Sequence, residues 1–251
     1  MPVSLTAQPG AGRTFFVADL HLTDERPAAT GRFFRFLDED VAGADALYIL
    51  GDLFEAWTGD DHDEQVARDT ARRMKALVDA GTPVYFMHGN RDFMLAARYA
   101  ARSGMTLLAD PARIDLYGVP TALMHGDTLC TDDAAYQAFR RRVRHPLTLA
   151  FLRRLPQALR RRLARQARAG SQAAKASKAA EIMDVNAKEV VRVLREQQVS
   201  RLIHGHTHRP AQHAHAVDGR DCERWVLPDW YTRWGYVACD ADGCTLRVDA
   251  L

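Results

Sequence analysis

The chain has no apolar run that approaches the roughly 18 to 20 residues needed to cross a membrane, and residues 1–13 lack the charged head and apolar core of a secretory signal. Its four cysteines stand far apart, at positions 130, 222, 239 and 244, and no two form a CxxC motif. This spacing argues against a disulfide framework and against a thiolate zinc site, so we expect a reducing cytoplasm. With 251 residues, 47% of them hydrophobic and 26% charged, the chain predicts one large folded domain, or one domain with an insertion.

Acidic residues are absent between Asp133 and Glu181. Residues 134–180 contain eleven Arg and two Lys and therefore carry a charge of +13, whereas the remaining 21 basic and 32 acidic residues give the rest of the chain −11. The sequence therefore predicts an acidic body with a basic insert. Basic blocks of this kind bind phosphates, whether of nucleic acid, of anionic lipid headgroups or of a phosphorylated substrate.

Short apolar runs bounded by Gly, Pro or Asp alternate with helical patterns. The runs predict strands at 14–18, 46–50, 83–87, 121–124 and 201–203, and apolar residues spaced by three and four predict helices over 34–41 and 66–77. This alternation indicates an α/β fold with parallel strands. Near the C-terminus, residues 225–227, 235–239 and 245–248 are typical of antiparallel strands, the last two joined by a turn at 240–243.

The basic insert follows the fourth of these strands and is itself predicted to be helical. Pro146 and Pro156 divide it into short helices, because proline cannot continue a helix. Four leucines share one predicted helical face, with arginines on the other faces: Leu152, Leu155, Leu159 and Leu163.

A polar cluster follows each of the five predicted core strands. The clusters are Asp19-Leu-His21, Gly51-Asp52, Gly89-Asn90-Arg91-Asp92, His125-Gly126-Asp127 and His204-Gly-His206-Thr-His208. Ligands of open α/β sheets bind beyond the carboxyl ends of the strands. We expect the two side chains of Asp19 and His21 to point the same way, because residues i and i+2 of a strand share a face.

Imidazole, carboxylate and amide groups without any thiolate favour ions such as Mn²⁺, Fe²⁺ or Zn²⁺. Seven candidate ligands exceed one site and fit two ions that share a carboxylate, roughly 3.5–4 Å apart, as in phosphoester hydrolysis. Each residue alone has a simpler interpretation: a helix cap for Asp19, a surface histidine for His21, a turn for Asn90. His204 is expected to be a structural histidine behind the ligands, and Cys130 a packed residue rather than a nucleophile.

Together the five clusters resemble the calcineurin-like metallophosphoesterases, whose pattern is D-x-H, G-D, G-N-[HR]-[DE], H and G-H-x-H. The match covers residues 14–210. It implies a four-layer α-β-β-α sandwich with a helical cap inserted after the fourth core strand. It also implies the metal ligands: Asp19, His21 and His208 on one ion, Asn90, His125 and His206 on the other, and Asp52 between them.

Longer stretches at 46–57, 88–93, 125–133, 182–186 and 204–210 resemble the branch of this family that hydrolyses UDP-2,3-diacylglucosamine in the lipid A pathway of Gram-negative bacteria. That resemblance implies hydrolysis of the pyrophosphate bond to UMP and 2,3-diacylglucosamine 1-phosphate (lipid X), with two divalent ions, usually Mn²⁺. Many relatives carry His after the Asn of the third motif, whereas this chain carries Arg91, whose fixed guanidinium suits a phosphate clamp.

The same resemblance makes the basic insert a cap that holds the acylated sugar. The implied catalytic residues are Asp52, Asn90, Arg91 and His206. The implied substrate-binding residues are Asn90, Arg91, Asp133, Ser171, Lys175, Lys178 and His206, with Tyr136, Arg168 and Met183 as neighbours. Two places depart from the branch: Lys175 stands where it has Asn, and residues 227–235 replace a Trp-His-Thr-Glu-Gly-like run, a change expected to leave the metal site untouched.

We divide the chain into a phosphoesterase core at 1–133, a basic helical cap at 134–180 and a second part of the core at 181–251. A basic amphipathic surface would sit on the anionic cytoplasmic face of the inner membrane without spanning it. Neither a nucleic-acid partner nor an obligate protein partner is expected. The rival hypotheses are a nuclease or other phosphodiesterase on the same scaffold, a non-catalytic scaffold with a degenerate metal site, and an Arg-rich RNA-binding module.

Overall fold

Two β-sheets form the centre of the molecule. The computed structural model describes residues 12–61, 64–176 and 184–251, with residues 171–176 described as backbone only. The first sheet has the order β11-β10-β1-β2-β3-β4, with β1 to β4 parallel and the C-terminal hairpin antiparallel. The bounds are β1 Thr14–Val17, β2 Ala46–Ile49, β3 Val84–Met87, β4 Thr106–Leu108, β10 Arg233–Asp240 and β11 Gly243–Ala250.

The second sheet has the order β5-β6-β7-β9-β8. Strands β6, β7 and β9 run parallel, and the outer strands β5 and β8 pair with them antiparallel. The bounds are β5 Ala112–Leu116, β6 Val119–Met124, β7 Arg201–His204, β8 Ala211–Val217 and β9 Arg220–Val226. The parallel strands of each sheet therefore end together, so their following loops can meet.

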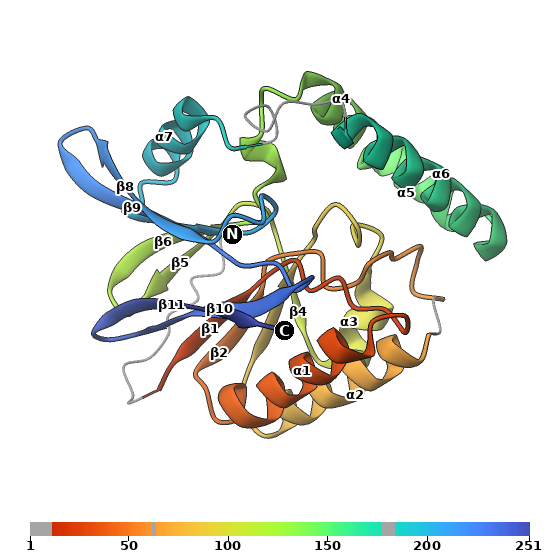
Figure 1. Ribbon diagram of the computed structural model, residues 1–251, viewed down its shortest axis with the longest axis horizontal. Coiled ribbons are helices and arrows are strands. Elements are labelled where there is room, and N and C mark those ends of the chain that lie inside the picture. The colour runs from red at the N-terminus through yellow and green to blue at the C-terminus, as the bar shows by residue number, and fades with distance from the viewer. Residues whose placement is uncertain (1–11, 62–63, 177–183) are drawn as a thin grey trace.

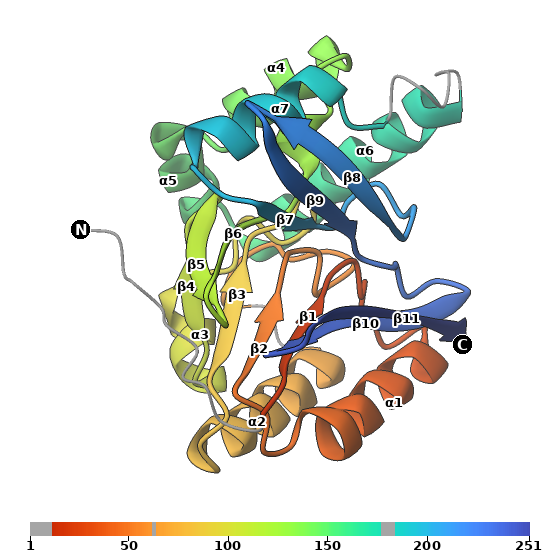
Figure 2. The ribbon, with the colours of Figure 1, turned by 90° about the vertical axis from the view of Figure 1, so that its left-hand side faces the viewer.

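Helices cover the outer face of each sheet, and three apolar clusters fill the spaces between four layers (Figures 1 and 2). One cluster joins the first sheet to α1 Pro27–Phe36, α2 Gln65–Asp79 and α3 Ala97–Ser103, with α1 extended by the π-helical turn Leu37–Val41. A second lies between the sheets, and a third joins the second sheet to α7 Ala187–Glu196. The fold is thus the expected α/β class, and its two sheets and their helices are consistent with an α-β-β-α arrangement.

The basic insert forms three helices after β6 that project from the body (Figure 1). They are α4 Ala134–Val143, α5 Pro146–Arg154 and α6 Gln157–Ala176. Pro146 starts α5, and the chain turns at Leu155 and Pro156 before α6 begins, so both prolines act as expected. Among the residues whose side chains are described, neither α4 nor α5 has a buried one.

The predicted leucine face of the insert is wrong in detail. Leu152 packs against the core under the first sheet, together with Leu149, and Leu155 lies outside the helices as the residue that ends α5. The break at Pro156 leaves Leu152 on α5 and Leu159 and Leu163 on α6, so the four leucines do not share one helical face. The exposed apolar side chains are Phe139, Leu147, Phe151, Leu159 and Leu163, with Leu147 76% and Phe151 61% exposed.

The sequence pattern did not predict three of the observed strands: β4, β5 and β8. Strands β4 and β8 lie at sheet edges and are largely accessible, so they lack the continuous apolar run of a buried strand. The strand predicted at 225–227 is the end of β9, which pairs parallel with β7 as well as antiparallel with β8. The turn at 240–243 does join β10 and β11.

A disulfide bond joins Cys239 to Cys244, which corrects the expectation of reduced cysteines. The two residues are direct partners across the β10–β11 hairpin, a proximity that appears only once the hairpin register is known. Cys130 and Cys222 are buried thiols. Among the described residues, no helix is long and apolar enough to cross a membrane.

Candidate metal centre

Five loops meet where the parallel strands of both sheets end. Asp19 and His21 follow β1, Asp52 follows β2, Asn90 and Arg91 follow β3, His125 follows β6, and His206 and His208 follow β7. The carboxylates of Asp19 and Asp52 and the rings of His21 and His125 are at most 2% exposed. The sequence clusters of five separate strands therefore form one buried polar site.

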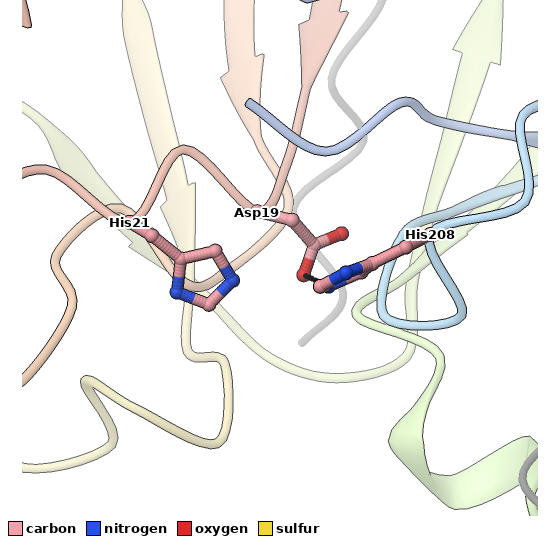
Figure 3. Close-up of side chains that lie close together, drawn as sticks. All are labelled: Asp19, His21 and His208. Carbon is pink, nitrogen blue, oxygen red and sulfur yellow. Dashed lines mark ion pairs between the residues drawn. The ribbon is translucent and has the colours of Figure 1, made fainter. Parts of the chain in front are cut away.

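One group of potential ligands consists of Asp19, His21 and His208, whose donor atoms all lie within 4.8 Å of one another (Figure 3). His208 Nε2 lies 3.5 Å from Asp19 Oδ1. Asp19 and His21 lie beyond the end of β1, at φ of 54° and 49°, so strand alternation does not align them as expected. Two left-handed backbone positions bring both side chains to the site instead.

A second group consists of Asp19, Asp52 and His125. Asp52 lies between the two groups, because its carboxylate is 3.8 Å from His21 Nε2 and 4.0 Å from His125 Nε2. The side-chain oxygen of Asn90 lies 3.2 Å from His125 Nε2 and 3.1 Å from His206 Nδ1. All seven predicted ligands thus gather at this place, with Asp19 and Asp52 near its middle.

The chemistry of this donor set fits divalent ions. Asp19 Oδ1 and both ring nitrogens of His21 are buried without a hydrogen-bond partner, although such burial is costly when unpaired. Nitrogen and oxygen donors without thiolate match the preferences of first-row divalent metals. Bound cations would satisfy the unpaired atoms and neutralise the buried carboxylates.

The electrostatics of the site reflect buried charges at close range. Burial raises the pKa of Asp52 to about 7, against the opposing charge of His125. For His125, burial lowers the pKa but the carboxylates of Asp52, Asp127 and Asp19 outweigh it, and the pKa rises to about 9. Burial also places the pKa of His21 well below its ordinary value, which leaves a neutral imidazole available to a metal.

Two motif glycines are required by close packing. Gly51 has φ of +93°, and an added Cβ would lie 2.5 Å from His125 Nδ1. A Cβ at Gly89 would lie 2.1 Å from Asp52 Oδ1. Any side chain at either position would therefore collide with a residue of the centre, which explains the G-D and G-N pairs of the sequence pattern.

Glu55 connects the centre to the insert, and the sequence did not single it out. Its carboxylate lies 3.6 Å from His21 Nδ1, accepts a hydrogen bond of 3.0 Å from the Tyr231 hydroxyl, and pairs at 2.7 Å with Arg168 of α6. A carboxylate beside the second nitrogen of a ligand histidine orients that ring. The available signal was the position of Glu55 three residues after Asp52, within the stretch 46–57 that resembles the family branch.

Tyr231 also corrects the expectation that residues 227–235 leave the metal site untouched. Its ring stacks on His21, with centroids 4.7 Å apart. The backbone N–H of Trp230 donates to the carbonyl of Asp19 at 3.0 Å. The segment therefore forms one wall of the centre.

Asp127 anchors the first helix of the insert. This fully buried carboxylate accepts from the Tyr136 hydroxyl at 2.8 Å and pairs with Arg140 Nε at 2.7 Å and Arg144 at 3.4 Å. Arg144 also donates to the carbonyl of Gly89. Burial opposes its charge, but His125 and the two arginines hold the pKa of Asp127 well below its usual range. The position of α4 is thus linked to the ligand loops.

Some of the remaining predicted substrate-binding residues lie near the centre, and others lie in parts of the chain whose side chains are not described. The backbone N–H of Arg91 donates to Asp52 at 2.8 Å, and the Tyr136 ring lies 6.0 Å from that of His206. Asp133 caps α4 by accepting from the N–H of Tyr136. Ser171 and Lys175 belong to α6, whose side chains are not described there, and Lys178 and Met183 lie outside the described residues.

His204 is buried behind the ligands, as expected. Its Nδ1 donates to the carbonyl of Gly205, so Nε2 is an acceptor, and Arg224 donates to it at 3.2 Å. Burial lowers the pKa of His204 to about 3. A neutral His204 is therefore held between the backbone and Arg224.

Comparison with known proteins agrees with this geometry. The model of the calcineurin-like phosphoesterase family matches residues 12–210, which include every cluster at the strand ends. The chain belongs to the calcineurin-like phosphoesterase family.

Relatives within the family cover nearly the whole chain. The UDP-2,3-diacylglucosamine hydrolase of Salmonella arizonae is 51% identical over 233 residues, 93% of this chain and 97% of that protein. The protein of the same name from Pseudomonas aeruginosa is 51% identical over 235 residues, 94% of each. Among solved structures, Vacuolar Protein Sorting 29 from Cryptosporidium parvum covers 96% of this chain and 91% of its own, at 12% identity and a TM-score of 0.48.

Proposed function

We propose that this enzyme hydrolyses the pyrophosphate bond of UDP-2,3-diacylglucosamine to UMP and 2,3-diacylglucosamine 1-phosphate in lipid A biosynthesis. The observation that most strongly supports this proposal is that about half of the residues, over nearly the full length, are identical to those of proteins named UDP-2,3-diacylglucosamine hydrolase. The buried Asp, His and Asn centre supports a hydrolase of phosphoesters, because such centres hold the ions that stabilise phosphoryl charge.

In this proposal Asp19, His21 and His208 would hold one divalent ion, Asn90, His125 and His206 would hold a second, and Asp52 would serve as a ligand shared by both. We propose Mn²⁺ as the metal, in accord with the nitrogen and oxygen donors. When bound, two such ions activate water and stabilise negative charge on the phosphoryl oxygens. The protein contributes by fixing the donors in advance, since backbone bonds from Arg91 to Asp52 and from His206 to Asp19 hold both carboxylates.

Arg91 and His206 would act on the substrate at the edge of the centre. Arg91 is half-buried beside the centre, and its Nε has no hydrogen-bond partner. A guanidinium offers paired donors that match phosphate oxygens, so Arg91 would clamp the pyrophosphate. Asn90 lies between His125 and His206 and would position the ring of His206 toward the same phosphate.

The insert would bind the diacylated sugar. Its exposed Phe139, Leu147 and Phe151 offer apolar surface, and acyl chains gain about 0.8 kcal/mol for each buried CH₂. Asp133, Ser171, Lys175 and Lys178 remain proposed contacts to the polar part of the substrate. We treat residues 134–180 as a functional cap on the core at 1–133 and 181–251.

The same surface suggests peripheral attachment to the cytoplasmic face of the inner membrane. Large apolar side chains stand beside numerous arginines on α5 and α6, a combination that binds anionic lipid surfaces without spanning them. We propose no nucleic-acid partner, because the described insert exposes few aromatic rings for base stacking.

A product assay tests the proposed function. Purified enzyme with Mn²⁺ should release UMP and lipid X from UDP-2,3-diacylglucosamine, and metal analysis should find two ions per active chain. Removal of metal by a chelator should stop turnover, and Mn²⁺ should restore it. Release of nucleotides from RNA or DNA, without hydrolysis of the lipid substrate, would instead support a nuclease.

A further inference from the structure

A cavity of about 430 Å³ is lined in part by His208, a candidate ligand of the metal centre. Its size falls within the range of about 300–1,000 Å³ that small-molecule sites occupy. The lining includes Thr207, His208, Arg209, Ala211, Arg224 and Arg233, from the loop after β7 and from β8, β9 and β10. In Figure 1, β8 and β9 lie on the opposite side of the molecule from α5 and α6 of the insert.

The cavity carries a positive charge that nearby carboxylates do not balance. Arg209 pairs with Asp184, and Arg233 Nε lies 3.3 Å from Asp229. Arg224 is only 7% exposed, yet within the described chain its guanidinium has no carboxylate at ion-pair distance, and its Nε has no hydrogen-bond partner. A buried guanidinium without a counter-ion is costly. An anionic ligand in this cavity would offset that cost.

The surrounding groups hold Arg224 in place, and the opposing charge that acts on it comes from Asp184, which lines the cavity and is paired with Arg209. Its guanidinium donates to His204 Nε2 at 3.2 Å, and His204 is itself fixed by the carbonyl of Gly205. His213 also lines the cavity, and burial together with Arg224 lowers its pKa, so it is neutral near pH 7. Thr207 Oγ1 is a further buried atom without a partner at the cavity.

The two ends of the substrate can leave the centre in different directions. His206 faces the insert, since the Tyr136 ring of α4 lies 6.0 Å from it. His208 borders both Asp19 of the centre and the arginine-lined cavity. A pyrophosphate at the centre would therefore place the acylated sugar toward the insert and the nucleotide along His208.

We infer that this cavity binds the UMP half of the substrate, with the guanidinium of Arg224 as its positive contact. The inference rests on the proposed function, because only a nucleotide-linked substrate leaves UMP at this side of the centre. It gives the buried Arg224 a role in binding the nucleotide. Arg224 is thus a specificity residue and takes no part in the reaction at phosphorus.

The test compares Arg224→Gln with the control Arg220→Gln, which removes a charge from an exposed position of the same strand. Calorimetry on the Mn²⁺-loaded full chain measures the affinity for UMP and for inorganic phosphate, independently of turnover. We expect wild type and the control to bind UMP at least tenfold more tightly than phosphate. Arg224→Gln should lower the affinity for UMP about tenfold, because it removes one charge-assisted hydrogen bond.

Kinetics separate binding from a structural effect. Arg224→Gln should raise KM for UDP-2,3-diacylglucosamine about tenfold while kcat changes by less than threefold. Ala211→Phe fills part of the cavity and keeps Arg224 and all candidate ligands in the chain, and it should raise KM in the same way, so a folding failure of one variant leaves the other to decide.

Two outcomes would overturn the inference, and a third would separate it from the proposed function. Equal affinity for UMP and phosphate would make the cavity a general anion site. A parallel loss of kcat on the lipid substrate and on bis(p-nitrophenyl) phosphate in Arg224→Gln would mean that Arg224 only supports the centre. Failure of wild type to hydrolyse the lipid substrate while it binds UMP through Arg224 would refute the proposed function and leave the nucleotide site standing.

Discussion

The body and the insert differ in how deeply they bury the side chains proposed to act on the substrate. In the body, Asp19, Asp52 and His125 are almost completely buried between two sheets, and hydrogen bonds from neighbouring loops hold them. In the insert, no side chain of α4 or α5 is more than partly buried, and Leu147 and Phe151 are exposed. A rigid centre suits chemistry that depends on fixed charge, whereas an exposed apolar surface suits recognition of lipid.

Among the contacts that join these regions, two reach the neighbourhood of the metal centre, one from each end of the insert. Asp127 binds Tyr136, Arg140 and Arg144 of α4, and Glu55 binds Arg168 of α6. Both carboxylates lie next to candidate metal ligands, since Asp127 follows His125 closely in the chain and Glu55 lies beside His21. The comparison therefore predicts that some substitutions affect only the chemistry, some only recognition, and those at the connections both.

The largest effect should come from the body. Asp52→Asn removes the carboxylate that lies between His21 and His125, and we expect a loss of at least about 10³-fold in kcat on both the lipid substrate and a small phosphodiester. Asp221→Asn, at an exposed position of β9, is the matched control and should keep full activity. Comparable rates in Asp52→Asn and the control would exclude Asp52 from the centre.

Arg91 should matter less than Asp52, because it acts on the substrate rather than on the metals. Arg91→Ala should lower kcat/KM for the lipid substrate by about 10²-fold, as loss of a bidentate charge-assisted contact predicts. Arg91→Lys should recover part of this loss, with no shift of the pH profile toward acid. Unchanged kcat/KM in Arg91→Ala would contradict the clamp.

Glu55 tests the connection between the regions. Glu55→Gln keeps the shape of the side chain but removes the charge beside His21 and Arg168, so Mn²⁺ affinity should fall about tenfold, as for other residues that orient ligand histidines. Glu39→Gln on the exposed turn after α1 serves as the control. Mn²⁺ titration by calorimetry measures the change. Equal Mn²⁺ affinities of Glu55→Gln and wild type would contradict a role of Glu55 in orienting His21.

Asp110 should change stability and leave the reaction unaffected. Burial, aided by Asp127, raises its pKa to about 6, above the value of an unfolded chain. The folded state therefore holds this proton more tightly, and the group destabilises the protein as pH rises through 4 to 6. Asp110→Asn should be more stable than wild type at pH 7.5, by up to about 3 kcal/mol, and the difference should vanish near pH 4. Urea unfolding of metal-free protein at both pH values measures it.

The sequence predicts that the candidate ligands gather at one place, because each of them lies within a few residues of the end of a strand. Parallel strands bring distant loops to one edge, so five short motifs suffice to place Asp19, Asp52 and His125 near one another. The layers follow from the alternation of strands and helices for the same reason. Contacts that depend on strand register or on the direction of a side chain cannot be predicted in this way.

Glu55, Tyr231 and the Cys239–Cys244 bond show where the sequence pattern ends. Glu55 reaches both His21 and α6 only because a left-handed turn places His21 beside it. Tyr231 stacks on His21 although 210 positions separate them. The disulfide depends on the pairing of β10 with β11. Periodicity carries no information about such pairs, and edge strands such as β8 lack a buried face to reveal them.

The division of labour between body and insert is tested most directly by one pair of rates on one variant. Leu147→Asp with Phe151→Asp places charge on the exposed apolar face of α5, and Ala150→Asp on the same helix is the control. We expect the double variant, folded and loaded with Mn²⁺, to lose at least about tenfold in kcat/KM on UDP-2,3-diacylglucosamine. A loss of this size corresponds to about two CH₂ groups of the acyl chains that are no longer buried. The double variant should hydrolyse bis(p-nitrophenyl) phosphate at the wild-type rate. Equal loss on both substrates, or loss on neither, would contradict this division of labour.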